Sequence, residues 1–185
     1  MLRTWKFAVA LVCLLPLGAQ ADEDHGIGKI VNDQMDLTYI DHVLTGRIGD
    51  RPVFGKPLAD AFGLSLWHKA EGQEFATELV REGDQFVGGI ESLNPQEEVV
   101  SADFIVTEVN GGEGRFRGSL AGRDFEVIIS ADEMEGHHYV DPTFDVLFAD
   151  GGAYQFQLEG SQACMGCALK LSYAVLSMLH AYGAL

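Results

Sequence analysis

The fold is decided by residues 153–183, which read AYQFQLEGSQACMGCALKLSYAVLSMLHAYG. Residues 154–158 alternate between apolar and polar side chains, which is the pattern of a strand with one buried face. A short polar connection follows, and the motif Cys164-Met165-Gly166-Cys167 then leads into a helical run over residues 168–182. The sequence therefore predicts a strand, a CxxC motif and a helix in direct succession.

The predicted helix is apolar over most of its circumference. With about 3.6 residues per turn, its polar side chains fall on one narrow stripe, which consists of Lys170, Tyr173, Ser177 and His180. A helix with this much apolar surface is either buried on most sides within the domain or covered by the surface of a partner. We therefore expect a core element that carries the CxxC motif at its first turn.

Cys164 and Cys167 leave three interpretations open. Backbone N–H groups at the start of a helix stabilise a thiolate, and Lys170 can add to this effect, so the pair could be redox-active. In an exported protein, two cysteines more often form a structural disulfide. The same sulfur atoms are also ligands for a soft metal such as copper or zinc. A c-type haem is excluded, because Ala168 stands where a histidine would be required.

The order of strand, loop, CxxC and helix resembles the local arrangement in thioredoxin-like proteins. This resemblance covers residues 153–183 only, and we expect no room after the helix for the later strands of those folds. We therefore do not assign the chain to that family, and we keep thiol–disulfide exchange as an alternative function.

Residues 1–21 have the pattern of a signal peptide. Arg3 and Lys6 form a basic start, an apolar stretch follows, and Ala19-Gln20-Ala21 is a predicted cleavage site. Residues 22–185 have the length of a single domain, and export would place this domain in the periplasm or outside the cell. No other stretch predicts a membrane span.

The chain of 185 residues is acidic, with a formal net charge of −16. Nucleic acid and anionic membranes are poor partners for such a surface, because like charges repel. Cations, a basic partner or plain solubility fit the acidic surface better, and the partner we expect is a protein or a small ligand. We expect no resident cofactor, with a divalent or soft metal ion as the alternative.

The middle of the chain predicts antiparallel strands. Short alternating runs are separated by turn residues, as at Asn110-Gly111-Gly112. Residues 36–44 predict one strand, residues 57–62 predict a helical turn opened by a proline, and residues 22–35 predict a loose lead-in. About nine strands would curl or split into two layers. The predicted fold is α+β and mostly β, an antiparallel meander that forms a barrel or sandwich packed on one C-terminal helix.

A second candidate site lies in residues 131–145, which read ADEMEGHHYVDPTFD. Carboxylates and imidazoles hold divalent cations, so the candidate metal ligands are His137, His138 and Asp141. If both histidines lay in a strand, they would face opposite sides and could not share one metal ion. The alternative interpretation is a solvated acidic connection.

The sequence contains no serine nucleophile elbow, phosphate-binding loop or HExxH motif, so the case for an enzyme rests on the CxxC motif. The main hypothesis is an exported, non-enzymatic domain that binds a ligand or partner and has a CxxC disulfide at the start of its core helix. The alternatives are a thiol–disulfide oxidoreductase and a copper or zinc carrier, both using Cys164 and Cys167. His42 and His68 lie among apolar residues and are predicted to be hydrogen-bonded structural histidines.

Overall fold

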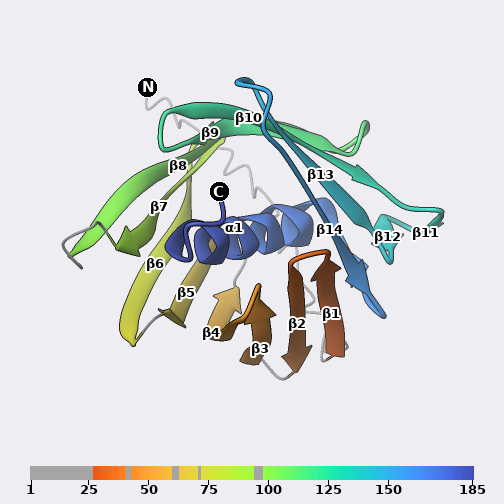
Figure 1. The fold of residues 1–185 in the computed structure, drawn as a ribbon. Coiled ribbons are helices and arrows are strands. Elements are labelled where there is room, and N and C mark those ends of the chain that lie inside the picture. Colours follow the sequence, from red (N-terminus) through yellow and green to blue (C-terminus); the bar gives the residue numbers. More distant parts are fainter. Residues whose placement is uncertain (1–26, 41–42, 60–62, 71, 94–97) are drawn as a thin grey trace, which may run out of the picture.

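Helix α1, Met165–Ala181, runs through the inside of a barrel of antiparallel strands (Figure 1). The computed structural model describes residues 27–40, 43–59, 63–70, 72–93 and 98–185. Within these ranges twelve strands close the barrel. They are β1 (Ile27–Asn32), β2 (Met35–Ile40), β3 (Val43–Ile48), β4 (Arg51–Ala59), β5 (Gly63–Ala70), β6 (Gln73–Glu82), β7 (Gln85–Leu93), β8 (Val99–Asn110), β9 (Arg115–Leu120), β10 (Arg123–Ser130), β13 (Thr143–Phe148) and β14 (Ala153–Glu159).

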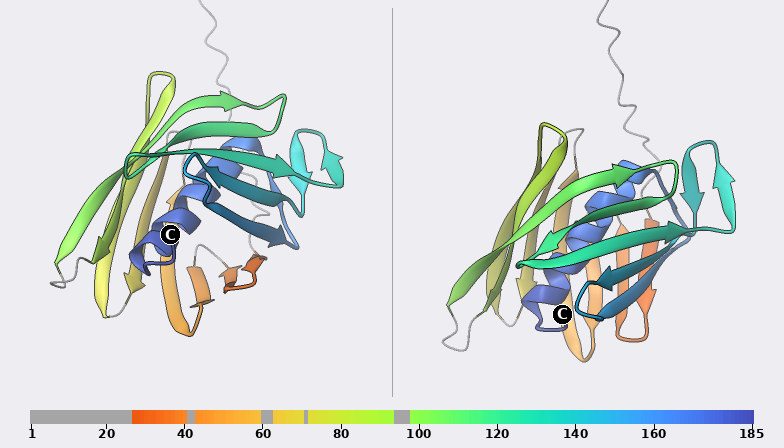
Figure 2. Two further views of the ribbon diagram at one scale, coloured as in Figure 1. Left: turned by 45° about the horizontal axis from the view of Figure 1, so that its top comes forward. Right: turned by 90° about the horizontal axis from the view of Figure 1, so that it is seen from above.

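The barrel is a meander in which each strand pairs with the next one along the chain, and β14 returns to pair with β1. In this closing pair Ile30 lies opposite Leu158. The meander is interrupted once, between β10 and β13, by strands β11 (Glu133–Glu135) and β12 (His138–Val140). These two strands form a small separate sheet with β15 (Gln162–Ala163), beside the barrel (Figure 2).

The helix is inside the barrel because the inner faces of the strands leave space that only another element can fill. About eight strands make a barrel whose interior side chains just fill it, and twelve make a wider one. The inward residues of the strands and most of α1 form one core, in which the largest side chains buried to below 2 % exposure include Tyr173, Phe75, Phe104, Phe116, Phe144 and Phe156. The views in Figure 2 agree that strands surround the helix.

Two tyrosines of the C-terminal segment anchor the helix to the barrel wall. The Tyr182 hydroxyl is 2.7 Å from the carbonyl oxygen of Pro52 and 2.9 Å from that of Lys69. The Tyr173 hydroxyl donates to the carbonyl oxygen of Gly89 at 2.5 Å. Within the predicted polar stripe, Tyr173 and Ser177 are fully buried, whereas Lys170 and His180 are half-buried.

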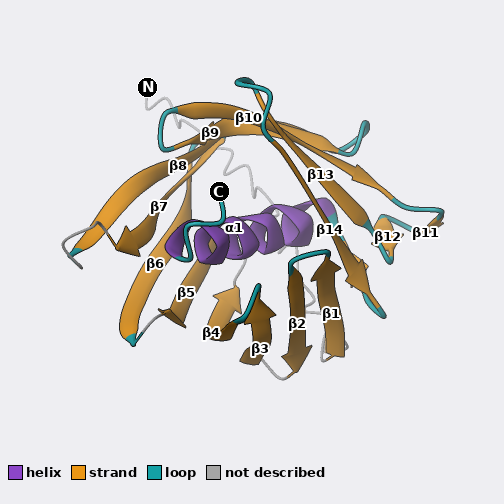
Figure 3. Cartoon of the chain, in the orientation of Figure 1, coloured by secondary structure: helices purple, strands orange, loops and turns teal. Residues whose placement is uncertain are grey.

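The predicted fold class is confirmed, and of the two predicted architectures the structure is a barrel (Figure 3). The single strand predicted over residues 36–44 is wrong, because this segment contributes to both β2 and β3. The loose lead-in predicted over 22–35 is wrong for residues 27–32, which form the barrel strand β1, and its residues 22–26 lie outside the described part of the chain. The predicted signal peptide and His42 lie outside the described residues. None of the helices in the described residues has the length and apolar character needed to cross a membrane.

The helical turn predicted over residues 57–62 is wrong as well. Pro57 lies in β4, opposite Leu66 of β5, while the pairing of β4 with β3 ends at Gly55. Proline lacks a backbone N–H group and is tolerated in a strand where one side of the ladder is unpaired. Residues 60–62 lie outside the described part of the chain.

Candidate functional site

The CxxC motif caps the start of α1. Cys164 is the N-cap residue with extended backbone angles, and its sulfur accepts a hydrogen bond from the backbone N–H of Cys167 at 3.2 Å. The two sulfur atoms are 2.7 Å apart, which is close but longer than the roughly 2.05 Å of a disulfide bond. Both side chains are partly exposed. The motif therefore stands at the first turn of the helix, as predicted.

The two thiols differ in acidity. The hydrogen bond from the Cys167 thiol, aided by backbone N–H groups and the charge of His138, lowers the pKa of Cys164 to about 5. The same thiol–thiolate hydrogen bond, together with burial, raises the pKa of Cys167, and the charge of Lys170 only partly offsets this. In a reduced pair Cys164 is thus the thiolate and Cys167 the proton-carrying partner.

The small sheet brings the acidic segment to the CxxC motif. β12 pairs with β15, so that Tyr139 lies opposite Ala163, the residue before Cys164. This pairing brings His138 near Cys164, and an imidazolium there contributes to the lowered pKa of Cys164. The two candidate sites of the sequence analysis are therefore one neighbourhood. Pairing between strands this far apart in the sequence leaves no local signal. Reasoning from the sequence therefore gave two separate candidate sites.

Of the three candidate metal ligands of this segment, His137 and His138 lie together, whereas the Asp141 carboxylate is engaged by a loop. The rings of His137 and His138 are 4.0 Å apart between centroids, because His137 lies in the turn before β12 rather than in the strand itself. Asp141 instead holds a loop, since one of its carboxylate oxygens accepts the N–H groups of Gly160 at 2.7 Å and Ser161 at 3.2 Å. Across the described residues no three histidine, cysteine or acidic side chains gather in a metal-binding group.

His68 is buried in the barrel wall, facing the interior. Its ring stacks on Phe75 with centroids 5.0 Å apart, and burial lowers its pKa to about 4. Neither ring nitrogen has a hydrogen-bond partner in the described part of the chain. The predicted structural position is confirmed, but the predicted hydrogen bond is wrong.

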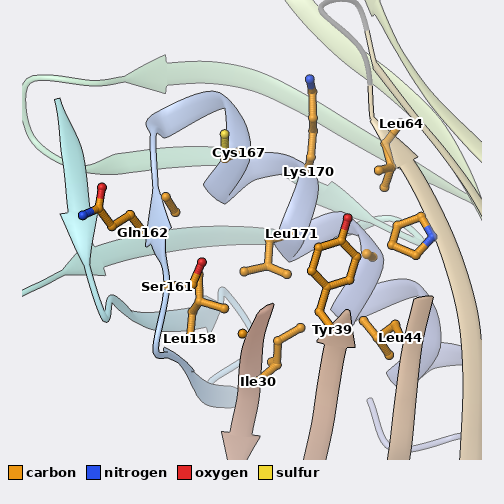
Figure 4. Close-up of a pocket in the computed structure, with 14 residues that line it drawn as sticks. Ile30, Tyr39, Leu44, Leu64, Leu158, Ser161, Gln162, Cys167, Lys170 and Leu171 are labelled. Atoms are coloured by element: carbon orange, nitrogen blue, oxygen red, sulfur yellow. The ribbon is translucent and has the colours of Figure 1, made fainter. Parts of the chain in front are cut away.

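A cavity of about 190 Å³ lies between the first half of α1 and strands β1 to β5 and β14 of the barrel (Figure 4). Its lining is mostly apolar, and the apolar residues come from several strands and from the helix: Ile30, Leu44, Pro57, Leu64, Leu158, Ala163, Leu171 and Ala174. On the helix, Cys167, Lys170, Leu171 and Ala174 line it together. This spacing of three and four residues places side chains on one helix face.

The polar groups of the cavity belong to Tyr39, Ser161, Gln162, Cys167 and Lys170. In Figure 4 the Lys170 ammonium and the Tyr39 hydroxyl point to the same side, away from Ile30. Because Cys167 contributes to the lining, the cavity and the CxxC motif share one wall. The cavity can therefore take a small molecule that is apolar along most of its length and polar at one end.

The strand residues of this cavity, such as Ile30 and Tyr39, were not predicted from the sequence. The sequence does show that Cys167, Lys170, Leu171 and Ala174 share one helix face. Such a face indicates packing in the core, however, and does not predict a cavity. Ile30 lies in the segment that was predicted as a loose lead-in, so the wall that β1 contributes to the cavity was not predicted. Comparisons with protein-family models, with curated proteins and with solved structures gave no match.

Proposed function

We propose that this protein is an exported binding protein whose barrel holds a small, largely apolar molecule between α1 and strands β1 to β5 and β14. We further propose that Cys164 and Cys167 form a disulfide that fixes the first turn of the helix at the wall of this cavity. The observation that supports the proposal is the apolar cavity of about 190 Å³, which extends the barrel interior beside the helix.

The size of the cavity limits the ligand. An apolar cavity of about 150 Å³ is enough to bind benzene, so this one suits a ring or a chain of roughly eight to ten non-hydrogen atoms. At about 0.5 kcal/mol per atom, such a ligand gains about 5 kcal/mol, which corresponds to a Kd of roughly 0.2 mM. Burial of apolar surface is the driving force, at about 25 cal/mol per Å².

The first test fills the cavity. Leu171→Trp places a larger side chain where Figure 4 shows Leu171 at the centre of the lining. Titration calorimetry with 1-octanol as the probe should show saturable binding to the wild type and at least tenfold weaker binding to this variant. The matched control is Leu147→Trp, at a position of β13 that is 42 % exposed. Absence of octanol binding to the wild type, or equal binding by both variants, would contradict the proposal.

The disulfide has its own test. Protein purified without reductant should contain no thiol that reacts under native conditions, and reduction should lower the melting temperature. The short distance between the sulfurs supports this expectation, because little movement is needed to join them. The Cys164→Ser/Cys167→Ser double variant controls for the reductant itself, since its melting temperature should not respond. Two freely titrating thiols in the untreated native protein would refute the disulfide.

A second candidate function is thiol–disulfide exchange, and the low pKa of Cys164 favours it. The Cys164 thiolate would attack a substrate disulfide, forming a mixed disulfide and releasing one substrate thiolate. Cys167 would give up its proton and attack the Cys164 sulfur, releasing the second substrate thiolate. The protein dithiol is then oxidised to a disulfide, and the substrate disulfide is reduced by two electrons.

Insulin reduction with dithiothreitol as the terminal reductant separates the two candidates. Exchange requires Cys164 as the attacking thiol, so Cys164→Ser should abolish any rate above that of dithiothreitol alone. Cys167→Ser should instead trap the mixed disulfide, which mass spectrometry detects. A wild-type rate equal to that of dithiothreitol alone would remove this function and leave the binding protein.

A further inference from the structure

We infer that the disulfide of Cys164 and Cys167 captures a small apolar thiol from the cavity beside α1, as a reversible mixed disulfide on Cys167. This inference rests on the proposed function, because it needs both the cavity and the disulfide, and it names the chemical class of the ligand. Its basis is the placement of the two cysteines. Cys167 lines the cavity, whereas Cys164 is not among the described residues that do so.

The cavity presents one sulfur of the disulfide to an apolar ligand. Figure 4 shows Cys167 on the first turn of α1, ahead of Leu171 in the lining. The Cys167 side chain is partly exposed. A thiol whose apolar body lies among Ile30 and Leu158 would therefore bring its sulfur atom to Cys167. A ligand of about nine non-hydrogen atoms suits the volume of about 190 Å³.

The start of the helix decides which sulfur is attacked. The Cys164 sulfur accepts the backbone N–H of Cys167 at 3.2 Å. The hydrogen bond from the Cys167 thiol is the largest effect that lowers the pKa of Cys164, and it is lost once Cys167 carries the ligand. The hydrogen bonds from the backbone N–H groups of Cys167 and Gly166 remain and still lower this pKa. The more acidic thiol leaves faster in disulfide exchange, so Cys164 is the leaving group and Cys167 is attacked.

The exchange balances without an added oxidant. The ligand thiol gives its proton to solvent, and its thiolate attacks the Cys167 sulfur. A bond forms between the ligand sulfur and Cys167, the bond between the two cysteines breaks, and its electron pair leaves with Cys164 as a thiolate. The ligand sulfur is thereby oxidised to the disulfide level, and Cys164 is reduced to the thiol level.

The direction of charge movement favours the captured state. The negative charge passes from the ligand, in a mostly apolar cavity, to Cys164 at the N-cap of α1, where backbone N–H groups stabilise a thiolate. A stabilised thiolate is also a weaker nucleophile, which slows the return attack. That return attack by Cys164 on the mixed disulfide re-forms the original disulfide and releases the ligand, so the capture is reversible.

The capture is measured with oxidised protein and 2-phenylethanethiol, an apolar thiol of about nine non-hydrogen atoms. Acid quenching stops the exchange, and peptide mass spectrometry locates the adduct. We expect the adduct on Cys167, with Cys164 as a free thiol. The control ligand is the hydrophilic 1-thioglycerol, which should react roughly tenfold more slowly per thiolate, because it gains little from an apolar cavity.

Competition assigns this difference to the cavity without changing the protein. An excess of 1-octanol should slow the reaction of 2-phenylethanethiol and leave that of 1-thioglycerol unchanged. Leu171→Trp should act in the same way as 1-octanol, whereas Leu147→Trp, at an exposed position of β13, should alter neither rate. Thermal unfolding shows whether both variants fold.

The outcomes separate this inference from the proposed function. An adduct on Cys164, or equal rates per thiolate for the two thiols, would overturn the inference, while binding of 1-octanol in calorimetry would leave the binding function standing. Two free thiols in the untreated native protein would remove the disulfide and this inference with it, again without affecting the cavity. If 1-octanol itself does not bind, the binding function fails.

Discussion

At the level of single residues, His68 makes stability depend on pH. Burial lowers its pKa from 6.5 to about 4 in the folded protein. Between these values the unfolded chain binds a proton that the folded protein does not. The contribution of His68 to the free energy of unfolding is therefore fully present above pH 6.5. It decreases by about 3 kcal/mol in total as the pH falls toward 4.

The measurement is urea unfolding of the wild type and His68→Leu at pH 7.5 and pH 4.5. Leucine keeps an apolar side chain against Phe75 and cannot be protonated. The variant should lose about 2–3 kcal/mol less stability than the wild type over this interval. Comparing the two proteins removes the contribution of the many acidic residues. An identical loss in both would show that His68 titrates normally in the folded protein.

Cys164 gives a second prediction for a single residue. In the reduced protein its pKa is lowered to about 5, while that of Cys167 is raised. Iodoacetamide at pH 6.5 should therefore alkylate Cys164 and spare Cys167, with a rate that increases from pH 4 to a plateau above pH 6. Peptide mass spectrometry identifies the modified residue. His138→Gln should shift the midpoint of this curve upward, and preferential labelling of Cys167 would be the contrary result.

At the scale of elements, the strands and the helix that could be predicted from the sequence are those whose pattern lies within one continuous segment. Residues 153–183 predicted β14, the CxxC motif and α1, because alternation and helical spacing are visible within one segment. β1 was missed because it is short and lies beside polar residues. β4 was missed in part because Pro57 is normally a strand breaker, and only its position beyond the end of β3 makes it acceptable. The pairing of β12 with β15, which assembles the site, depends on tertiary structure alone.

The attachment of α1 to the barrel can be tested at Tyr182. Its hydroxyl lies 2.7 and 2.9 Å from two backbone carbonyl oxygens, on β4 and β5. Tyr182→Phe leaves these part-buried acceptors without their partner, so we expect a loss of about 1–3 kcal/mol in the free energy of unfolding. Tyr139→Phe, on the small sheet, is the matched control and should cost less. Denaturant unfolding of both variants provides the comparison, and equal losses would show that Tyr182 has no special anchoring role.

At the scale of the whole molecule, the barrel and the helix should be stable only together. The strands direct large side chains such as Phe104 and Phe144 inward, and α1 contributes Leu169, Val175 and Leu176 to the same core. Each buried aliphatic side chain contributes about 1.5–3 kcal/mol, so loss of the helix removes as much as a typical domain has in total, about 5–15 kcal/mol. The helix, in turn, is too apolar to remain free in water.

A chain that ends at Ala163 should therefore lack cooperative unfolding and bind a hydrophobic dye. A synthetic peptide of residues 164–185, added in trans, should restore a cooperative transition that depends on peptide concentration. The same peptide with Leu176→Asp is the matched control, because it places a charge at a position that is fully buried, and it should restore nothing. If the truncated chain unfolded cooperatively at the midpoint of the full protein, the helix would be an accessory to an independently stable barrel.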